Sequence, residues 1–182
     1  MNGIATCIAR GRSCGALLLL CLTMLLTGCY PDLDWRELQW RDGDFSVMFP
    51  ARPTEVTREI ELGGTVLEMH MLRAEVKDMA FGVAYAHLPP GVDTSVLLTA
   101  ARDGLVRNIG GRVSEEQVVE LPGLNGQAFR AEGRAADQDM MIAARLLAGG
   151  GRFYQVLFVG PRVNSAEIDL DFYLGSFKRL NP

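Results

Sequence analysis

The sequence predicts an α+β domain, in which an antiparallel β-sheet of about seven strands is flanked by helices. Short runs of alternating apolar and polar residues fill most of the chain from residue 44 onward, and such alternation is typical of half-buried strands. Glycine and proline turns separate the runs, as in hairpins. Two segments instead repeat apolar residues every three or four positions, as amphipathic helices do. Helices placed between and after hairpins indicate the α+β class.

The first three strands follow from alternation and from one turn signal. In the first strand Phe45, Val47 and Phe49 share a face, and the prolines that follow end the strand. A Gly-Gly pair at residues 63–64 lies between two strand-like runs and predicts a tight hairpin. The three expected strands are residues 44–49, 55–62 and 65–76.

Two runs, residues 80–88 and 152–159, are apolar on both faces. Strands of this kind are expected in the interior of a sheet, where both faces are covered. In the first run large residues such as Phe81 and Tyr85 alternate with glycine and alanine. The small side chains of the second face allow a helix to pack closely against it.

Three further strands are expected around two turns. The turns are the Leu-Pro-Gly at 121–123 and the triple glycine at 149–151. In the middle strand Phe129 and Ala131 are expected to face the core, while the charged residues between them face water. The three strands are residues 113–120, 127–134 and 139–148.

Two helices complete the predicted domain. The first begins with Asp93 or Thr94 as its cap and ends at the glycines 110–111. The second runs from about Ser165, a suitable cap, to Gly175. The expected apolar stripes are Leu97, Leu98, Ala101, Leu105 and Ile109 in the first helix, and Ile168, Phe172 and Leu174 in the second.

The amino terminus has the organisation of a secretory signal. Arg10 and Arg12 precede an apolar run at residues 16–26, which is shorter than the roughly 20 apolar residues of a membrane-spanning helix. The residues that end it, LTGC at 26–29, resemble the lipobox of bacterial lipoproteins. The resemblance implies cleavage before Cys29, whose thiol would carry a diacylglyceryl group and whose amine would carry a further acyl chain.

The expected organisation is a lipoprotein signal peptide at residues 1–28, the lipidated cysteine with a short tether at 29–43, and the α+β domain at 44–182. The membrane is then one partner, reached through the lipid anchor. Tyr30 follows the cysteine. Because aspartate at this position retains lipoproteins in the inner membrane of enteric bacteria, its absence favours the periplasmic face of the outer membrane.

Composition limits the classes of partner and chemistry. Loss of residues 1–28 removes three of the four cysteines and two of the 18 Lys and Arg residues, which leaves 16 basic against 22 acidic residues and a net charge of −6. With Cys29 lipidated, no thiol remains for a disulfide. An acidic domain without a run of basic residues is a poor partner for nucleic acid.

Four short motifs follow one another along the predicted domain. They are FSVMFP at 45–50, LPGLNG at 121–126, GRFY at 151–154, and SFK at 176–178 after Phe172. Their order resembles that of PsbP-like domains. The resemblance implies an antiparallel sheet between helices, the PsbP-like sandwich. It also implies a protein that acts by binding, to a photosynthetic complex, a GTPase or an envelope partner, and it carries no shared set of catalytic residues.

Met69, His70 and Met71 are a candidate metal site, since thioethers and imidazole bind Cu(I). Strand geometry argues against it, because residues 69 and 71 share one face while His70 points to the other. Such a site would need further methionines to converge, namely Met48, Met79, Met140 or Met141.

No catalytic constellation is recognised in the sequence. His70 and His87 accompany neither a nucleophile elbow nor an HExxH motif, and we interpret them as ordinary surface or core residues. Three pairs of acids are interpreted as solvated faces, because none has the spacing of a calcium-binding loop. They are Glu115-Glu116, Asp137 with Asp139, and Asp169 with Asp171.

The sequence therefore predicts a membrane-anchored, non-catalytic binding or accessory module of an envelope complex, with an envelope protein as partner and no cofactor. The alternative is a periplasmic lipoprotein that binds a small ligand or a metal such as copper. That alternative predicts an apolar pocket between helix and sheet, or convergent Met and His side chains. A hydrolytic enzyme is a third hypothesis, and it requires an acid–base pair in a cleft.

Overall fold

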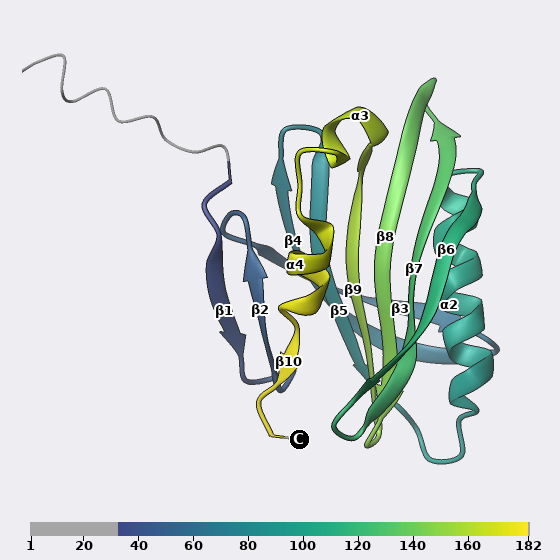
Figure 1. Cartoon of the computed structure of the whole chain (residues 1–182). Coiled ribbons are helices and arrows are strands. Elements are labelled where there is room, and N and C mark those ends of the chain that lie inside the picture. Colours follow the sequence, from purple (N-terminus) through teal and green to yellow (C-terminus); the bar gives the residue numbers. More distant parts are fainter. Residues whose placement is uncertain (1–32, 182) are drawn as a thin grey trace, which may run out of the picture. The chain divides into compact units, whose positions relative to one another are not determined.

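Residues 33–181, which the computed structural model describes, form two antiparallel sheets and three helices. The larger sheet has the order β3-β4-β5-β9-β8-β7-β6, and the smaller has the order β1-β2-β10 (Figure 1). The elements are β1 (Arg36–Trp40), β2 (Phe45–Phe49), β3 (Thr54–Leu62), β4 (Thr65–Val76), β5 (Met79–His87), α2 (Thr94–Asn108), β6 (Arg112–Leu121), β7 (Leu124–Ala135), β8 (Gln138–Gly149), β9 (Arg152–Pro161), α3 (Arg162–Ser165), α4 (Leu170–Gly175) and β10 (Lys178–Arg179).

The seven-stranded sheet confirms the predicted fold class. Its hairpins turn where glycine signals them, so that Leu62 pairs with Thr65 across the Gly-Gly turn and Leu121 pairs with Leu124 across Pro-Gly. The two strands that are apolar on both faces, β5 and β9, pair with each other in the interior of the sheet. Strands β3 and β6 are left as its edges.

Each face of the large sheet is covered by a different layer. On one face α2 buries Leu97 and Ala101 in a cluster with the small residues Ala84 and Ala86 of β5. On the other face the three-stranded sheet and α4 cover the larger side chains, including Phe81. Figure 1 shows α2 on one side of the large sheet and β1, β2 and α4 on the other. The alternation of large and small residues along β5 thus determines which layer each face receives.

The expectation of a tether up to residue 43 is wrong for its second half. Residues Arg36–Trp40 form β1, which pairs antiparallel with β2 from Arg36 opposite Phe49 to Trp40 opposite Phe45. Trp35, Leu38 and Trp40 pack against the core. Because this apolar surface is buried against β2 and the large sheet, the segment is part of the domain.

The single helix expected from Ser165 to Gly175 is also wrong. The structure has a short α3 that ends at Ser165 and a separate α4 that begins at Leu170. The Ser165 hydroxyl donates back to the carbonyl of Arg162 at 2.7 Å, so it does not cap a following helix. The carboxylate of Asp169 accepts from the backbone N–H of Phe172 at 2.8 Å and caps α4 instead.

Hydrogen bonds from three aromatic side chains join the layers on the aromatic face. The Tyr154 hydroxyl donates to the carbonyl of Gly43 at 3.0 Å, and the Tyr173 hydroxyl of α4 donates to the carbonyl of Gly82 at 3.0 Å. The indole N–H of Trp40 donates to the Tyr85 hydroxyl at 3.3 Å. Burial raises the pKa of Tyr154 and Tyr173, so both hydroxyls remain protonated donors at neutral pH.

Gly126 marks a close approach of two backbones within the sheet, and its replacement by alanine is expected to destabilise the fold by about 1–3 kcal/mol. A Cβ atom there would lie 1.8 Å from the backbone oxygen of Leu146, so the strands must shift to admit it. The matched control is Gly175→Ala, where the added carbon meets nothing within 4 Å. Thermal unfolding of both variants measures the effect, and equal melting temperatures would contradict it.

Candidate functional site

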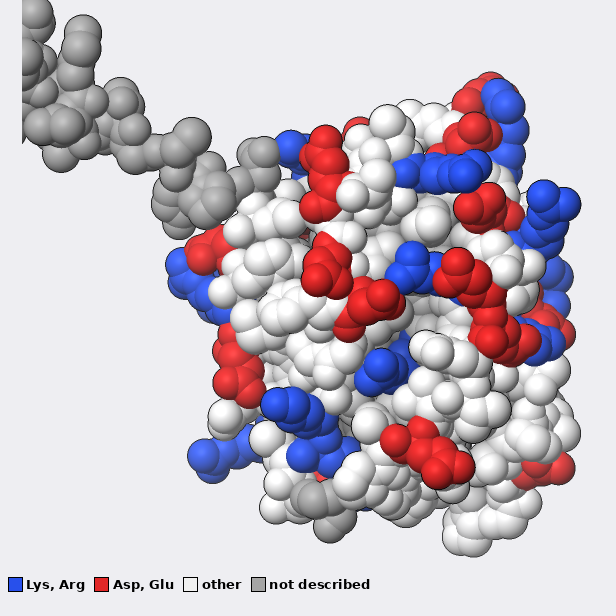
Figure 2. Space-filling model, viewed as in Figure 1, with Lys and Arg blue, Asp and Glu red and all other residues white. Residues whose placement is uncertain are grey.

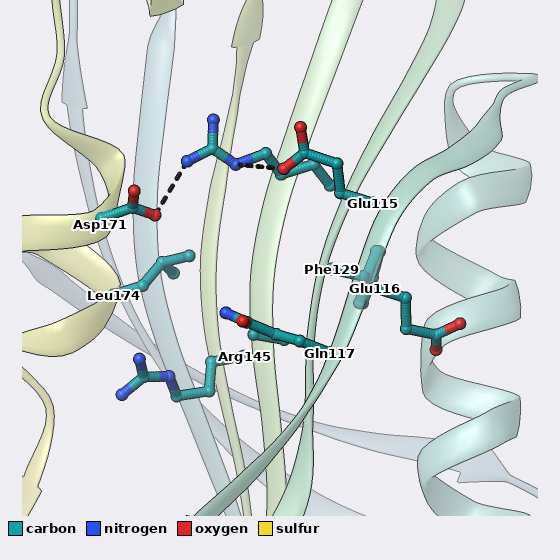
Figure 3. Close-up of a pocket in the computed structure, with 9 residues that line it drawn as sticks. Glu115, Glu116, Gln117, Phe129, Arg145, Asp171 and Leu174 are labelled. Atoms are coloured by element: carbon teal, nitrogen blue, oxygen red, sulfur yellow. Dashed lines mark hydrogen bonds and ion pairs between the residues drawn. The ribbon is translucent and has the colours of Figure 1, made fainter.

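A polar pocket of about 350 Å³ opens where α4 leaves the strands β6–β8 uncovered (Figure 3). The sheet register places Gln117 of β6 beside Ala128 of β7, and Ala128 beside Arg145 of β8. In the neighbouring row Glu115 lies beside Arg130. Because Ala128 is small, the long side chain of Arg145 has room beside it. The lining residues are Glu115, Glu116, Gln117, Ala128, Phe129, Arg130, Arg145, Asp171 and Leu174.

Arg130 connects the sheet to α4 at one end of this pocket. Its guanidinium lies 2.8 Å from a carboxylate oxygen of Asp171 on α4 and 3.5 Å from one of Glu115 on β6. Figure 3 draws both ion pairs as dashed lines. Both carboxylates thus serve as acceptors for one cation.

Arg145 is the second cation of the pocket and has a different environment. It is half-buried, and its Nε atom is buried with no hydrogen-bond partner among the described residues. Burial lowers the pKa of Arg145, while the negative charge of Asp171 acts in the opposite direction. An arginine stays charged under these conditions. The pocket therefore contains a guanidinium whose hydrogen-bonding capacity is not fully used.

Glu116 lies on the far side of the pocket from Arg145. Figure 3 shows its side chain pointing toward α2, where it accepts from Arg102 at 2.9 Å. That hydrogen bond is the largest of the effects that raise the pKa of Arg102. Glu116 therefore connects the edge strand to α2.

An apolar hollow of about 280 Å³ lies on the opposite face of the sheet, over strands β4, β5 and β9. The alternative function predicted an apolar pocket between helix and sheet. The hollow is apolar, but α2 contributes none of its lining residues. They are Met71, Leu72, Arg73, Ala80, Phe81, Gly82, Val83, Ala84, Gln155, Leu157 and Val159.

The candidate copper ligands Met69, His70 and Met71 do not converge. Met69 is buried in the cluster beneath α2, with Met71 packed against the same cluster. His70 lies on the other face, where its ring stacks on Tyr85 at 5.0 Å. Its ring nitrogens lie 3.0 Å from the Thr57 hydroxyl and 3.1 Å from a Glu68 carboxylate oxygen. Within residues 33–181, no three His, Cys, Asp or Glu side chains are grouped to hold a metal ion.

The remaining candidates are placed as follows. Cys29 and the signal segment lie outside the described residues. His87 is exposed at the end of β5. Arg134 donates to the backbone oxygen of Asp137 and lies 3.9 Å from the carboxylate of Asp139. The pairs 115–116 and 169–171 are divided, because in each pair one residue belongs to the Arg130 ion pairs and the other has a separate partner.

Sequence reasoning missed Arg145, although a signal for it is present. Residues 143, 145 and 147 share one face of β8, and Ala143 and Leu147 are both 0% exposed. A charged residue between two fully buried positions interrupts an otherwise apolar face. Such an interruption often indicates a functional residue.

Comparison with known proteins supports the fold. No family model matches the chain, and no curated protein matches it. Among solved structures, the solution structure of cyanobacterial PsbP (CyanoP) from Synechocystis sp. PCC 6803 superposes with a TM-score of 0.54 at 9% sequence identity. The match covers 84% of this chain and 96% of that one. The chain therefore has the PsbP-like fold, as its motif order predicts.

Proposed function

We propose that this chain is a lipid-anchored, non-catalytic binding or accessory module of a bacterial envelope complex. The observation that carries the proposal is the LTGC sequence at residues 26–29, at the end of an 11-residue apolar run that starts at residue 16. The residue after Cys29 is tyrosine, which favours the periplasmic face of the outer membrane.

A lipid anchor at Cys29 would hold the domain close to the bilayer. Each buried methylene contributes about 0.8 kcal/mol, so several acyl chains on one cysteine make release negligible. Three residues separate Cys29 from Leu33, the first residue of the described domain, and three residues span on the order of 10 Å. No helix within the described residues is long and apolar enough to cross a membrane.

Three features of the domain support binding as its activity. The chain shares the PsbP-like fold, and the motif resemblance implies proteins that act by binding. In the polar pocket Glu115 and Asp171 are ion-paired with Arg130, which suits charge recognition better than proton transfer. Acidic and basic side chains are interspersed on the face seen in Figure 2. Such a surface suits a partner whose own charges are complementary to this local pattern.

Replacing Cys29 with serine is expected to move the protein from the membrane fraction to the soluble periplasmic fraction, because the variant has no thiol to acylate. Palmitate labelling of cells that express each form measures acylation directly. The matched control is Cys21→Ser, which changes a cysteine of the apolar run and leaves the LTGC sequence intact. An unchanged membrane fraction and retained label in Cys29→Ser would contradict the anchor.

The accessory role is tested by crosslinking in cells, with captured proteins identified by mass spectrometry in the native and Cys29→Ser forms. A defined envelope protein captured only by the lipidated form supports the role. If neither form captures a specific partner although both are well expressed, the result counts against the role.

The apolar hollow over β4, β5 and β9 favours small-ligand binding as a second candidate function. A hollow lined by apolar side chains accommodates an apolar molecule. Native mass spectrometry of the protein extracted from its own membrane tests this. A bound molecule lost on Gly82→Leu, which would fill the hollow, supports ligand binding, and an unliganded mass opposes it.

A further inference from the structure

We infer that the polar pocket recognises a single carboxylate, and that Arg145 is the residue that binds it. The inference deepens the proposed binding function and rests on it, because it names the chemistry that a partner would present to this site. It depends on three features of the pocket: the unpaired Nε donor of Arg145, the paired state of Arg130, and the carboxylates of Glu115 and Asp171 at the rim.

Arg145 occupies a position where an apolar residue would be buried at a lower cost in free energy. Its neighbours on the same strand face, Ala143 and Leu147, are fully buried, and Val156 beside it on β9 is also 0% exposed. A charged group removed from water without a partner is unfavourable. The buried Nε atom of this guanidinium has no hydrogen-bond partner among the described residues, so its place in this face is explained by a group that arrives from outside.

The chemistry of Arg145 selects a planar anion. A guanidinium presents parallel N–H donors in a fixed fork that matches the two oxygens of a carboxylate. Arg145 lines the open pocket together with Gln117 and Leu174 (Figure 3). The neighbouring amide can add a hydrogen bond, and the leucine can contact the apolar stem of an acidic side chain.

The rim argues for one negative charge and against phosphate. Arg130 is already neutralised by Glu115 and Asp171, so it offers little attraction to a further anion. The third acidic residue of the lining, Glu116, points toward α2 and accepts from Arg102, so the carboxylates at the rim are those of Glu115 and Asp171. A doubly charged phosphate would meet like charges at the rim, whereas a single carboxylate is balanced by Arg145 alone.

The carboxylate could be carried by an acidic side chain of a partner, by its carboxyl terminus, or by a free small acid. The test uses the full lipidated protein in detergent micelles, with nitrogen NMR of the arginine Nε–H groups. The probes are N-acetylglutamate amide for the side chain, N-acetylalanine for the terminus, sodium acetate for a free acid, and inorganic phosphate.

We expect a saturable shift of the Arg145 signal with at least one carboxylate probe. The affinity for phosphate is expected to be weaker than that for the best carboxylate by about tenfold or more. Arg145→Met is expected to abolish saturable binding, and Arg58→Met, an exposed arginine of β3, to leave it unchanged. The probe that binds most tightly identifies the source. Phosphate binding equal to or tighter than every carboxylate, or no saturable shift with any carboxylate, would overturn the inference.

Thermal unfolding separates a recognition role from a structural one. Because the buried Nε atom of Arg145 has no hydrogen-bond partner among residues 33–181, Arg145→Met is expected to melt at the same temperature as the native protein or higher. A clear loss of thermal stability would make Arg145 a structural residue and overturn the inference. The titration does not depend on membrane attachment. The Cys29→Ser experiment can therefore contradict the lipid anchor without affecting the titration, and the two failures are distinguishable.

Discussion

Replacement of Phe45 by alanine is expected to lower the free energy of unfolding by about 3–5 kcal/mol. The side chain is 0% exposed. Its ring stacks on Phe177 with centroids 5.6 Å apart and lies edge-on to Tyr85 and Tyr154 at 5.9 and 6.2 Å. These partners belong to the large sheet and to the segment after α4, so the cavity would open where the two sheets meet.

Urea denaturation followed by circular dichroism measures this loss as a lower midpoint with an unchanged slope. The matched control is Phe172→Ala, which removes a ring that is 47% exposed. The smaller buried area predicts a smaller effect there. A loss for Phe45→Ala no greater than for the control would show that the contact between the sheets does not depend on this ring.

The sequence predicted the large sheet well because its signals are local. Alternation requires only neighbouring residues, and the Gly-Gly turn at 63–64 determines the pairing of the strands that flank it. The interior position of β5 followed from its two apolar faces, and the structure confirms it. The opposite orientation of Met69 and His70 likewise followed from strand geometry alone.

One error occurred where a long-range contact decided the local structure, and the other where two local hydrogen bonds competed with a longer helix. The segment Arg36–Trp40 is a strand because β2 is available to pair with it, and five residues give too short a pattern to show this in advance. At the other end of the chain, the interaction of Ser165 with its own preceding turn and the cap at Asp169 compete with a single longer helix. Both alternatives are compatible with the apolar spacing of the region.

The candidate pocket could be predicted only in part. The Pro-Gly turn pairs Leu121 with Leu124 and, in the same register, brings Glu115 opposite Arg130. This part of the pocket follows from the turn, because the register shift between Val113 and Glu115 lies beyond the pair. The position of α4, which brings Asp171 within 2.8 Å of Arg130, depends on packing between residues more than 40 positions apart.

Asp44 is expected to be the most sensitive charged residue of the domain, with a loss of about 3–5 kcal/mol on replacement by alanine. Its side chain, 10% exposed, lies 3.1 Å from a guanidinium nitrogen of Arg179. It also accepts from the backbone and side-chain nitrogens of Asn181 at 3.1 and 2.6 Å. Alanine would leave Arg179 without its carboxylate and would release the carboxyl-terminal segment.

Backbone strain must be separated from charge at this position, because Asp44 has a φ of +58°. Alanine is disfavoured in that conformation, whereas asparagine tolerates it. Asp44→Asn therefore removes the charge alone and is expected to cost less than Asp44→Ala, about 1–3 kcal/mol. Equal losses for the two variants would show that the charge, and not the backbone, accounts for the whole effect.

The pH dependence of folding stability shows whether the charge of Asp44 stabilises the fold. Burial raises the pKa of Asp44, but hydrogen bonds from Asn181 and Arg179 outweigh it, so the pKa lies below its usual value. The contribution is therefore complete above the unfolded pKa of about 3.9 and is lost as the pH falls through the lower folded pKa. The stability difference between the native protein and Asp44→Asn should be constant from about pH 5 to pH 8 and shrink below about pH 4. A difference that persists undiminished in acid would mean that the asparagine variant is destabilised by its shape and not by the loss of its charge.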